Sequence, residues 1–595
     1  MSRRRETAPI PTTVSDTLNG VTYKRLRYLG KGGFARCYEF QNATTGEVVA
    51  GKVVSKSLLT KPHQKEKMMQ EIALHKTLQH RNVVMFKSSF QDPHFVYITL
   101  EICKKQSLME LHKRRGPLTE PEVRYYMKQI GEGMDYLHNT MKIIHRDLKL
   151  GNIFINSDMV LKLGDLGLAT RINSPDERKR TLCGTPNYIA PEILVKSGHS
   201  FEVDMWSSGC IMYTLLVGKP PFETSSLKET YSRIKRTEYV IPEDTVGPAA
   251  SNLITSMLMN NPKTRITATK MLQHEFLTEG YLPKRLPTSS LTVRPHFTER
   301  QMTFNTTKKP LIAVDNMPEG EDNQGYARPT IRKSLMPDDT LVAKADATTK
   351  RIQRKQEDID SLYELLQDAI LNANHEVPEL PEDAEHPASS PVYWISKWVD
   401  YSDKYGIGFM LCDNSVGVLF NDATRAMLHA NAKNMQYLDK EYQESFFTKN
   451  DFPQAVKKKV SLVDYFRKYM IEHLLKAGAA AAPKEGDELS RLPYLRTWFR
   501  TRTAICLWLS NGSMQVNWFE SHEKVIFCPK MKAVTLLNQD GSTQTFLVRK
   551  LHTLGITNGM MEKIKYAKQM VRKCKEGVVA EERHHKQRMR ENLRP

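Results

Sequence analysis

The fold is decided by the stretch HRDLKLGN at residues 145–152, which places an acid, a base and an amide close together in the chain. The triplets DLG and APE follow it at residues 165–167 and 190–192. A glycine-rich stretch, GKGGFARC, and a strand-like run, VAGK, precede it at residues 30–37 and 49–52. Chance co-occurrence of HRDLKLGN, DLG and APE in this order is negligible, whereas the glycine-rich stretch alone is weak evidence.

The order of these motifs resembles that of the protein kinases. In-line transfer of a phosphoryl group needs an oriented hydroxyl and a way to neutralise the charge on the phosphates. The resemblance implies that Asp147 takes the hydroxyl proton and that Lys149 reaches the transferred group. Asn152 and Asp165 would bind Mg²⁺. Lys149, together with the triplet GTP at residues 184–186, resembles the serine/threonine branch, with ATP as the phosphate donor.

The glycine-rich stretch is predicted to be a hairpin that covers the phosphates of ATP. Its small residues would let backbone N–H groups approach the phosphate oxygens. Lys52 would clamp the α- and β-phosphates if the carboxylate of Glu71, in a predicted helix, held it in place. Each feature has a simpler explanation in isolation: a plain hairpin turn, a solvent-exposed strand lysine and a charge on a helix surface.

Thr181 lies between the DLG and APE triplets, beside Arg178, Lys179 and Arg180. We hypothesise that phosphate on Thr181 pairs with Arg146 and orders this segment, which switches activity on. The alternative is a threonine that is merely exposed in a loop.

The length of 595 residues is too great for one hydrophobic core, so we expect roughly two to four domains. Short β-rich runs precede longer helical periodicity in the first half, which indicates a β lobe and an α lobe. Two later stretches look alike, each with alternating apolar residues around an Asn-containing turn and then a helix-like run. The predicted fold class is α+β, with these parts: a disordered tail (1–22), the two-lobed unit (23–277), a linker (278–390) that has too little apolar surface to order itself apart from a short helix near 358–372, two sheet-plus-helix repeats (394–476 and 493–576) and a basic C-terminal tail (577–595) that is disordered from His584 to Arg594.

Three stretches match a narrower family. They are GGFARC at residues 32–37, TLCGTPNY at 181–188 and WISKWVDYSDKYG at 394–406. By these marks the chain resembles a polo-like kinase of the animal Polo type. The resemblance spans the first unit and the C-terminal half, and it implies a two-lobed protein kinase fold followed by two polo boxes. Leu166 stands where most kinases have Phe, but the metal-binding Asp165 is kept.

The resemblance also implies two sets of binding residues. ATP would be bound by Leu29, Gly30, Lys31, Gly32, Gly33, Phe34, Ala35, Cys37, Ala50, Lys52, Leu100, Glu101, Cys103, Phe154 and Asp165. The polo boxes would bind phosphoserine or phosphothreonine peptides through Trp398, Leu474, Arg500, Phe519, His522 and Lys524, the last two holding the phosphate. Without the resemblance, Trp398 would be interpreted as a core aromatic residue and His522 as a turn residue.

The implied biology is mitotic: mitotic entry, centrosome maturation, spindle assembly, kinetochore attachment and cytokinesis. The implied partners are protein substrates already phosphorylated by another kinase, centrosomal, kinetochore and spindle proteins, and an activating upstream kinase. The implied locations are cytoplasm and nucleus, and during division the centrosome, spindle, kinetochore and midbody. Arg332 and Leu335 resemble a destruction box, and the cluster Lys104, Lys105, Lys113, Arg114 and Arg115 resembles a bipartite nuclear signal, although a solvated helix face explains it equally well.

The formal net charge of +20 leaves other functions open. A basic surface suits nucleic acid, an acidic membrane face or acidic protein substrates, but the sequence has no nucleic-acid reader motif. No run approaches the roughly 18 apolar residues of a membrane span, and the N-terminus has no secretory signal, so we expect a reducing compartment and eight free cysteines. The rival hypothesis is a scaffold with vestigial catalysis, which intact Lys52, Asp147, Asn152 and Asp165 disfavour.

Overall fold

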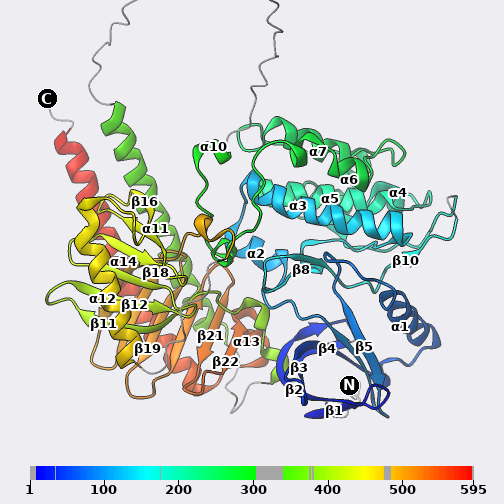
Figure 1. The fold of residues 1–595 in the computed structure, drawn as a ribbon, viewed down its shortest axis with the longest axis horizontal. Coiled ribbons are helices and arrows are strands. Elements are labelled where there is room, and N and C mark those ends of the chain that lie inside the picture. The colour runs from blue at the N-terminus through cyan, green and yellow to red at the C-terminus, as the bar shows by residue number, and fades with distance from the viewer. Residues whose placement is uncertain are drawn as a thin grey trace, which may run out of the picture.

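The structure is a computed structural model. It describes residues 9–33, 35–174, 176–302, 339–373, 377, 381–474 and 484–592. Figure 1 shows a two-lobed unit on the right and, beside it, two sheets with long helices on the left. This arrangement of helices and antiparallel sheets confirms the predicted α+β class. Predicted residues Phe34, Arg332 and Leu335 lie outside the described part of the chain.

The first lobe is an antiparallel sheet with the strand order β1-β2-β3-β4-β6-β5. Its strands are β1 (Thr13–Asp16), β2 (Val21–Gly32), β3 (Ala35–Asn42), β4 (Val48–Ser55), β5 (Phe86–Gln91) and β6 (Phe95–Leu100). Helix α1 (Pro62–His75) covers one face, where Met68 and Ile72 pack on Val54 and Ile98. Aromatic side chains fill the other face, among them Tyr38, Phe40 and Tyr97.

The second lobe is mainly helical. Its helices are α2 (Leu108–Arg115), α3 (Glu120–Asp135), α4 (Pro191–Leu194), α5 (Glu202–Val217), α6 (Leu227–Arg236), α7 (Pro248–Met257), α8 (Ala268–Leu272), α9 (Glu275–Thr278) and α10 (Glu299–Met302). Two short antiparallel strand pairs flank the motif loops. They are β7 (Ile143–Ile144) with β10 (Thr170–Arg171), and β8 (Ile153–Ile155) with β9 (Leu161–Leu163). Helix α5 is apolar on most of its surface and is therefore the buried centre of the lobe, where Trp206 stacks on Phe222 at 5.4 Å between ring centroids.

The second half of the chain contains two successive meanders that repeat one design. The first sheet consists of β11 (Ile395–Tyr401), β12 (Gly406–Leu411), β13 (Val416–Phe420), β14 (Arg425–Leu428), β15 (Asn434–Leu438) and β16 (Glu444–Thr448), followed by α12 (Lys457–His473). The second consists of β17 (Leu495–Arg500), β18 (Ala504–Leu509), β19 (Met514–Trp518), β20 (Lys524–Cys528), β21 (Ala533–Leu537) and β22 (Thr543–Leu547), followed by α13 (Val548–Leu554) and α14 (Asn558–Asn592). The predicted repeat of sheet plus helix is therefore present.

Matching turns and close packing explain the repeat. Asn414 and Gly512 both have a positive φ, 71° and 90°, in the equivalent turns between the second and third strands of each sheet. Helix α12 lies so close to its sheet that a Cβ on Gly408 would come within 2.3 Å of the Phe466 ring. The two sheets share one apolar core, where Phe409 of the first packs with Leu507 of the second. Gln515 also exchanges two 2.8 Å hydrogen bonds with the backbone of Ile395.

The linker is more ordered than predicted. Leu286 and Leu291 are buried in the core of the second lobe, so the chain remains packed beyond residue 278. The short helix predicted near 358–372 is the end of a longer helix, α11 (Asp339–Leu371), which packs on α14 through Ile359 and Leu366. The sequence showed the apolar stripe of this helix but not its polar first half.

Both predicted tails also differ from the structure. β1 pairs with β2 from Thr13 onward, because Val14 is buried against the aromatic face of the first sheet. α14 extends to Asn592, so residues 584–592, which were predicted to be disordered, are helical. Its extension is held by buried Val578 and by Glu581, whose carboxylate accepts hydrogen bonds from Lys355 at 2.7 and 3.0 Å.

The linker segment before β11 connects the two halves. Glu382 accepts hydrogen bonds from Tyr38 at 2.7 Å and Arg36 at 3.2 Å, and Asp383 pairs with Lys31 at 3.3 Å. Burial and the Glu382 contact raise the pKa of Tyr38 to about 12. The acidic linker therefore contacts β2 and β3, the strands that flank the glycine-rich turn.

The basic cluster that resembles a nuclear signal is only partly exposed: Lys104 and Lys113 are at the surface, but Arg114 and Arg115 are not. Arg114 is 5% exposed and donates to the carbonyls of Ala388 and Ser390, at 3.2 and 3.1 Å. Arg115 pairs with Glu122 at 2.7 Å, and both side chains are buried. The alternative, a solvated helix face, is therefore wrong for these two residues, and the nuclear signal stays a prediction.

A buried ion pair anchors the second lobe and yields a stability prediction. Arg265 contacts both oxygens of Glu192 at 2.7 and 3.1 Å, and their side chains are 0% and 3% exposed. Arg265→Met leaves a buried carboxylate without its partner, which costs about 3–5 kcal/mol. Calorimetry should show the melting transition of this unit lowered by on the order of 10 °C.

The matched control is Arg236→Met, because the Arg236–Glu238 pair is exposed on both sides and should contribute less than about 1 kcal/mol. Equal shifts for the two variants would contradict the assignment of Arg265 as an anchor.

Candidate active site and phosphopeptide groove

The predicted reaction site assembles around the carboxylate of Asp147. Lys149 Nζ lies 2.7 Å from Asp147 Oδ2, and Asn152 Nδ2 donates to the same oxygen at 3.0 Å. Thr185 Oγ1 donates to Asp147 Oδ1 at 2.7 Å and lies 3.2 Å from Lys149 Nζ. Three positions from the predicted motifs therefore fix one carboxylate in a single orientation.

A buried acid outside the predicted motifs holds the loop that carries Asp147. Asp204, at the start of α5, accepts the backbone N–H groups of His145 and Arg146, both at 2.8 Å, and contacts His138 Nε2 at 2.9 Å. Burial alone would raise the pKa of Asp204, but these hydrogen bonds outweigh it and lower the pKa below its ordinary value. Sequence reasoning missed Asp204, because an acid at the start of a helix is ordinary and signals no site.

The lysine of β4 and the acid of α1 form the predicted pair. Lys52 Nζ lies 2.7 Å from Glu71 Oε1. Burial would lower the pKa of Lys52, but Glu71 and then Asp165 outweigh this and raise it, so the lysine is fully protonated. Asp165 is thereby placed beside Lys52, and its positive φ of 58° sets the turn of the DLG triplet.

The side chains expected to bind Mg²⁺ suit a hard cation. Asp165 offers carboxylate oxygens, and Asn152 offers an amide oxygen because its nitrogen donates to Asp147 O at 2.8 Å. Oxygen ligands of this kind are those that Mg²⁺ prefers, and one or two protein oxygens suffice when phosphates supply the others. Among the described residues, no group of three or more His, Cys, Asp or Glu side chains could hold a metal by itself.

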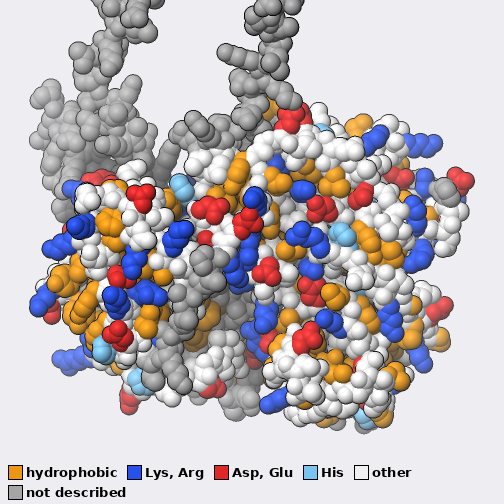
Figure 2. Space-filling model, in the orientation of Figure 1, with side chains coloured by type: hydrophobic (Ala, Val, Ile, Leu, Met, Phe, Trp, Pro, Cys, Tyr) orange, Lys and Arg blue, Asp and Glu red, His pale blue; other side chains and the backbone are white. Residues whose placement is uncertain are grey.

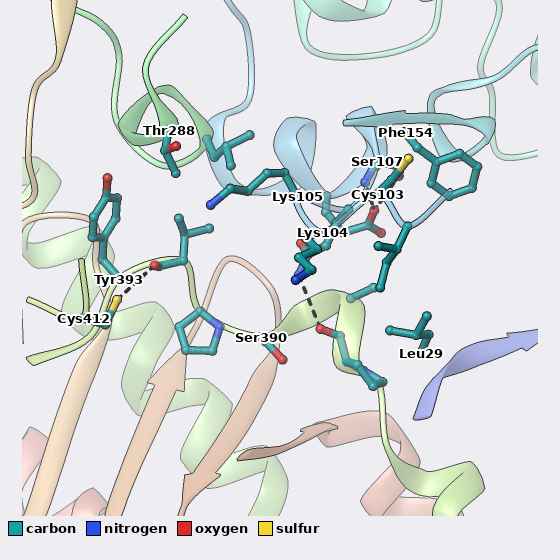
Figure 3. A pocket seen from close by; sticks show the side chains of 18 of the residues that line it. Leu29, Cys103, Lys104, Lys105, Ser107, Phe154, Thr288, Ser390, Tyr393 and Cys412 are labelled. Atoms are coloured by element: carbon teal, nitrogen blue, oxygen red, sulfur yellow. Dashed lines mark hydrogen bonds between the residues drawn. The ribbon is translucent and has the colours of Figure 1, made fainter. Parts of the chain in front are cut away.

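The predicted adenine-binding residues line one end of a cavity of about 990 Å³. Leu29, Cys37, Ala50, Leu100, Cys103 and Phe154 are all in its wall, and Val84 is a further member that no motif predicted. Figure 3 shows Leu29, Cys103 and Phe154 on one side, and Tyr393 and Cys412 on the other. The cavity thus extends from the space between the lobes to the first residues of the C-terminal half. Burial raises the pKa of Cys103 to about 12, which keeps its thiol protonated.

Thr181 is at the surface, in the segment between the DLG and APE triplets (residues 168–189), here called the activation segment. The Thr181 side chain is exposed, and its neighbour Leu182 is 60% exposed. Arg146 Nε donates to Leu168 O at 2.7 Å, which ties the arginine before Asp147 to this segment. The pairing of phosphorylated Thr181 with Arg146 stays a prediction.

The predicted groove residues meet where the two sheets of the C-terminal half adjoin. The rings of Trp398 and Phe519 are 6.1 Å apart, and the Arg500 guanidinium lies 5.9 and 5.0 Å from their centroids. Lys524 Nζ donates to Ser396 O at 2.6 Å, and His522 occupies the tight turn before β20 with a φ of 52°. Leu474 follows α12, and its carbonyl accepts a hydrogen bond from Lys397.

Comparison with known proteins agrees with this geometry. A sequence model of the protein kinase domain matches residues 23–277, and one of the POLO box duplicated region matches residues 403–460 and 501–564. The chain is 50% identical over 572 residues to the serine/threonine-protein kinase PLK1 of Xenopus laevis, covering 95% of this chain and 92% of the relative. It is 46% identical to the serine/threonine-protein kinase polo of Drosophila melanogaster (95% and 97% covered) and to plk-1 of Caenorhabditis elegans (96% and 89% covered).

The chain belongs to the polo-like kinase family. It is a serine/threonine kinase with a polo-box region, and its kinase domain implies the use of ATP. No helix in the described ranges is long and apolar enough to span a membrane. Figure 2 shows Lys and Arg side chains scattered among acidic ones over the visible face, rather than gathered in one stripe.

The Lys52–Glu71 contact predicts a specific kinetic defect. Glu71→Gln removes the anionic partner of Lys52, and losing a charged hydrogen bond costs about 1.5–3 kcal/mol. We expect kcat/KM for ATP to fall roughly 10–100-fold. Glu66→Gln, on the exposed face of the same helix, is the control and should retain full activity. Equal activity of the two variants would show that the contact does not serve ATP binding.

Proposed function

We propose that this kinase phosphorylates serine and threonine in proteins that its polo boxes have first bound through a phosphoserine or phosphothreonine. The observation that carries the catalytic part is the fixed carboxylate of Asp147, which Lys149, Asn152 and Thr185 orient together. The kinase unit would span residues 23–277, and the polo boxes 394–476 and 493–576. The setting would be cell division, at the centrosome, spindle, kinetochore and midbody, with partners from those structures.

Asp147 would accept the substrate hydroxyl proton as the oxygen attacks the γ-phosphorus of ATP, while ADP leaves with the electrons of the broken P–O bond. Lys149 Nζ would lie beside the transferred group, and Lys52 would hold the α- and β-phosphates. Asn152 and Asp165 would bind Mg²⁺, which neutralises phosphate charge when present. Because these groups are already in place, little reorganisation is needed at the moment of transfer.

The docking part is supported by the cluster at the junction of the polo boxes. Trp398 and Phe519 provide an aromatic wall with the Arg500 guanidinium against it, Lys524 reaches the backbone of Ser396 on the same strand as Trp398, and His522 is in the turn before β20. Cationic donors suit a phosphate dianion. A docked substrate is held near the active site at a raised effective concentration, so docking changes substrate choice without changing the chemistry.

The docking proposal is tested with a protein substrate in two forms, primed by one phosphothreonine or unprimed. We expect His522→Ala combined with Lys524→Met to lower kcat/KM for the primed form at least tenfold, to the unprimed value, because two charged contacts are lost. Activity on a short unprimed peptide should stay constant. The control is Lys530→Met, an exposed lysine after the same strand. Unchanged preference for the primed substrate in the double variant would refute docking by these residues.

The switch at Thr181 is tested by Thr181→Val on protein treated with an upstream kinase. The phosphate would add charge-assisted contacts to Arg146, so the variant should remain at least tenfold less active. Ser174→Ala, exposed in the same segment, is the control. Full activity of Thr181→Val would discard the switch.

A further inference from the structure

A lysine without a role in the predicted set of phosphopeptide-binding residues lies beside Trp398 on β11. Lys397 precedes Trp398 on β11, and its ammonium donates to the carbonyl of Leu474. Leu474 directly follows α12, where the helix dipole places partial negative charge. Lys397 therefore connects the strand that carries Trp398 to the end of α12.

A second ammonium comes from the other polo box. Lys524, on β20, reaches across the junction and donates to Ser396 O at 2.6 Å, on the residue that precedes Lys397. Burial lowers the pKa of Lys524, and the positive charge of Lys397 lowers it further. Lys524 of the second polo box thus reaches the residue that directly precedes Lys397 of the first, so the two lysines meet at the junction of the boxes.

Two cations held together in a half-buried groove cost free energy, which an anion of matching charge offsets. A phosphate monoester carries a charge of about −1.5 to −2 near neutral pH and has three acceptor oxygens, whereas a carboxylate carries only one charge. The pair is therefore suited to a phosphate dianion. Trp398 directly follows Lys397, and its ring lies 6.1 Å from that of Phe519, so an aromatic surface adjoins the two lysines.

We propose that Lys397 is a third phosphate-binding cation, contributed by the first polo box and facing the pair formed by His522 and Lys524 of the second. On binding, its ammonium would leave the Leu474 carbonyl for the phosphate. The freed carbonyl would then accept an N–H group of the peptide backbone, so recognition of the phosphate and of the backbone would be coupled. This inference rests on the proposed docking function and deepens it.

The simpler role for Lys397 is to stabilise the end of α12. The two roles predict different effects on peptides that differ only at the phosphorylated position. A helix-stabilising lysine affects every peptide alike, because it acts through the shape of the groove. A phosphate-binding lysine affects phosphopeptides more than the same peptide with Glu or unmodified Thr at that position.

The experiment measures the binding of three peptides to the full chain by fluorescence polarisation. The peptides are identical except for phosphothreonine, glutamate or threonine at one position. Lys397→Met keeps most of the aliphatic stem, so packing is retained. Losing one charged hydrogen bond should weaken phosphothreonine binding about tenfold. Binding of the other two peptides should change less than about twofold, and Lys397→Arg should restore most of the loss.

The control is Lys404→Met, an exposed lysine in the turn between β11 and β12, which should bind like the parent chain. Equal weakening for all three peptides in Lys397→Met, with a lowered melting temperature, would assign Lys397 to the helix and overturn the proposal. Unchanged phosphothreonine binding would overturn it too. If the parent chain itself did not prefer the phosphothreonine peptide, the proposed docking function would fail instead, which is a separate outcome.

Discussion

The buried carboxylate of Asp204 is the contact on which the active site depends. It accepts two backbone N–H groups of the loop before Asp147 and contacts His138, and it does so from the start of the most buried helix in the second lobe. Because the loop is fixed to the core at this point, Asp147 can be oriented by its own neighbours rather than by substrate. A reaction centre built on a preorganised loop needs little rearrangement during transfer.

The two halves of the chain are joined by more than a tether. The acidic segment at Glu382 and Asp383 contacts the strands beside the ATP loop, and one cavity reaches from the adenine side to Tyr393 and Cys412. The kinase domain and the C-terminal half are therefore in direct contact beside the ATP loop. In the polo-box region, Trp398 comes from the first sheet and Phe519 and Lys524 from the second, so neither box contains the whole set of residues proposed for docking.

The motifs predicted the two-lobed fold, the Lys52–Glu71 pair and the assembly around Asp147, because in these places a local residue pattern carries the chemistry. The twin sheets were also predictable, from alternating apolar residues around turns at Asn414 and Gly512. Asp204, Val84 and Lys397 were not, since each acquires its role from a partner distant in the sequence. The helical tail and β1 were missed for a similar reason: Val578 and Val14 become core residues only against segments distant in sequence.

The most direct test of the account is ATP-dependent phosphorylation of casein by the purified chain, its Asp147→Asn variant and the control Asp176→Asn, in which an exposed acid is changed. Each protein is first treated with an upstream kinase, which is then removed, so that the activation segment does not limit the rate. We predict that Asp147→Asn loses nearly all activity with an unchanged melting temperature, while Asp176→Asn retains it. Equal, background-level phosphorylation by all three proteins would contradict the account and favour a scaffold that docks phosphoproteins without phosphorylating them.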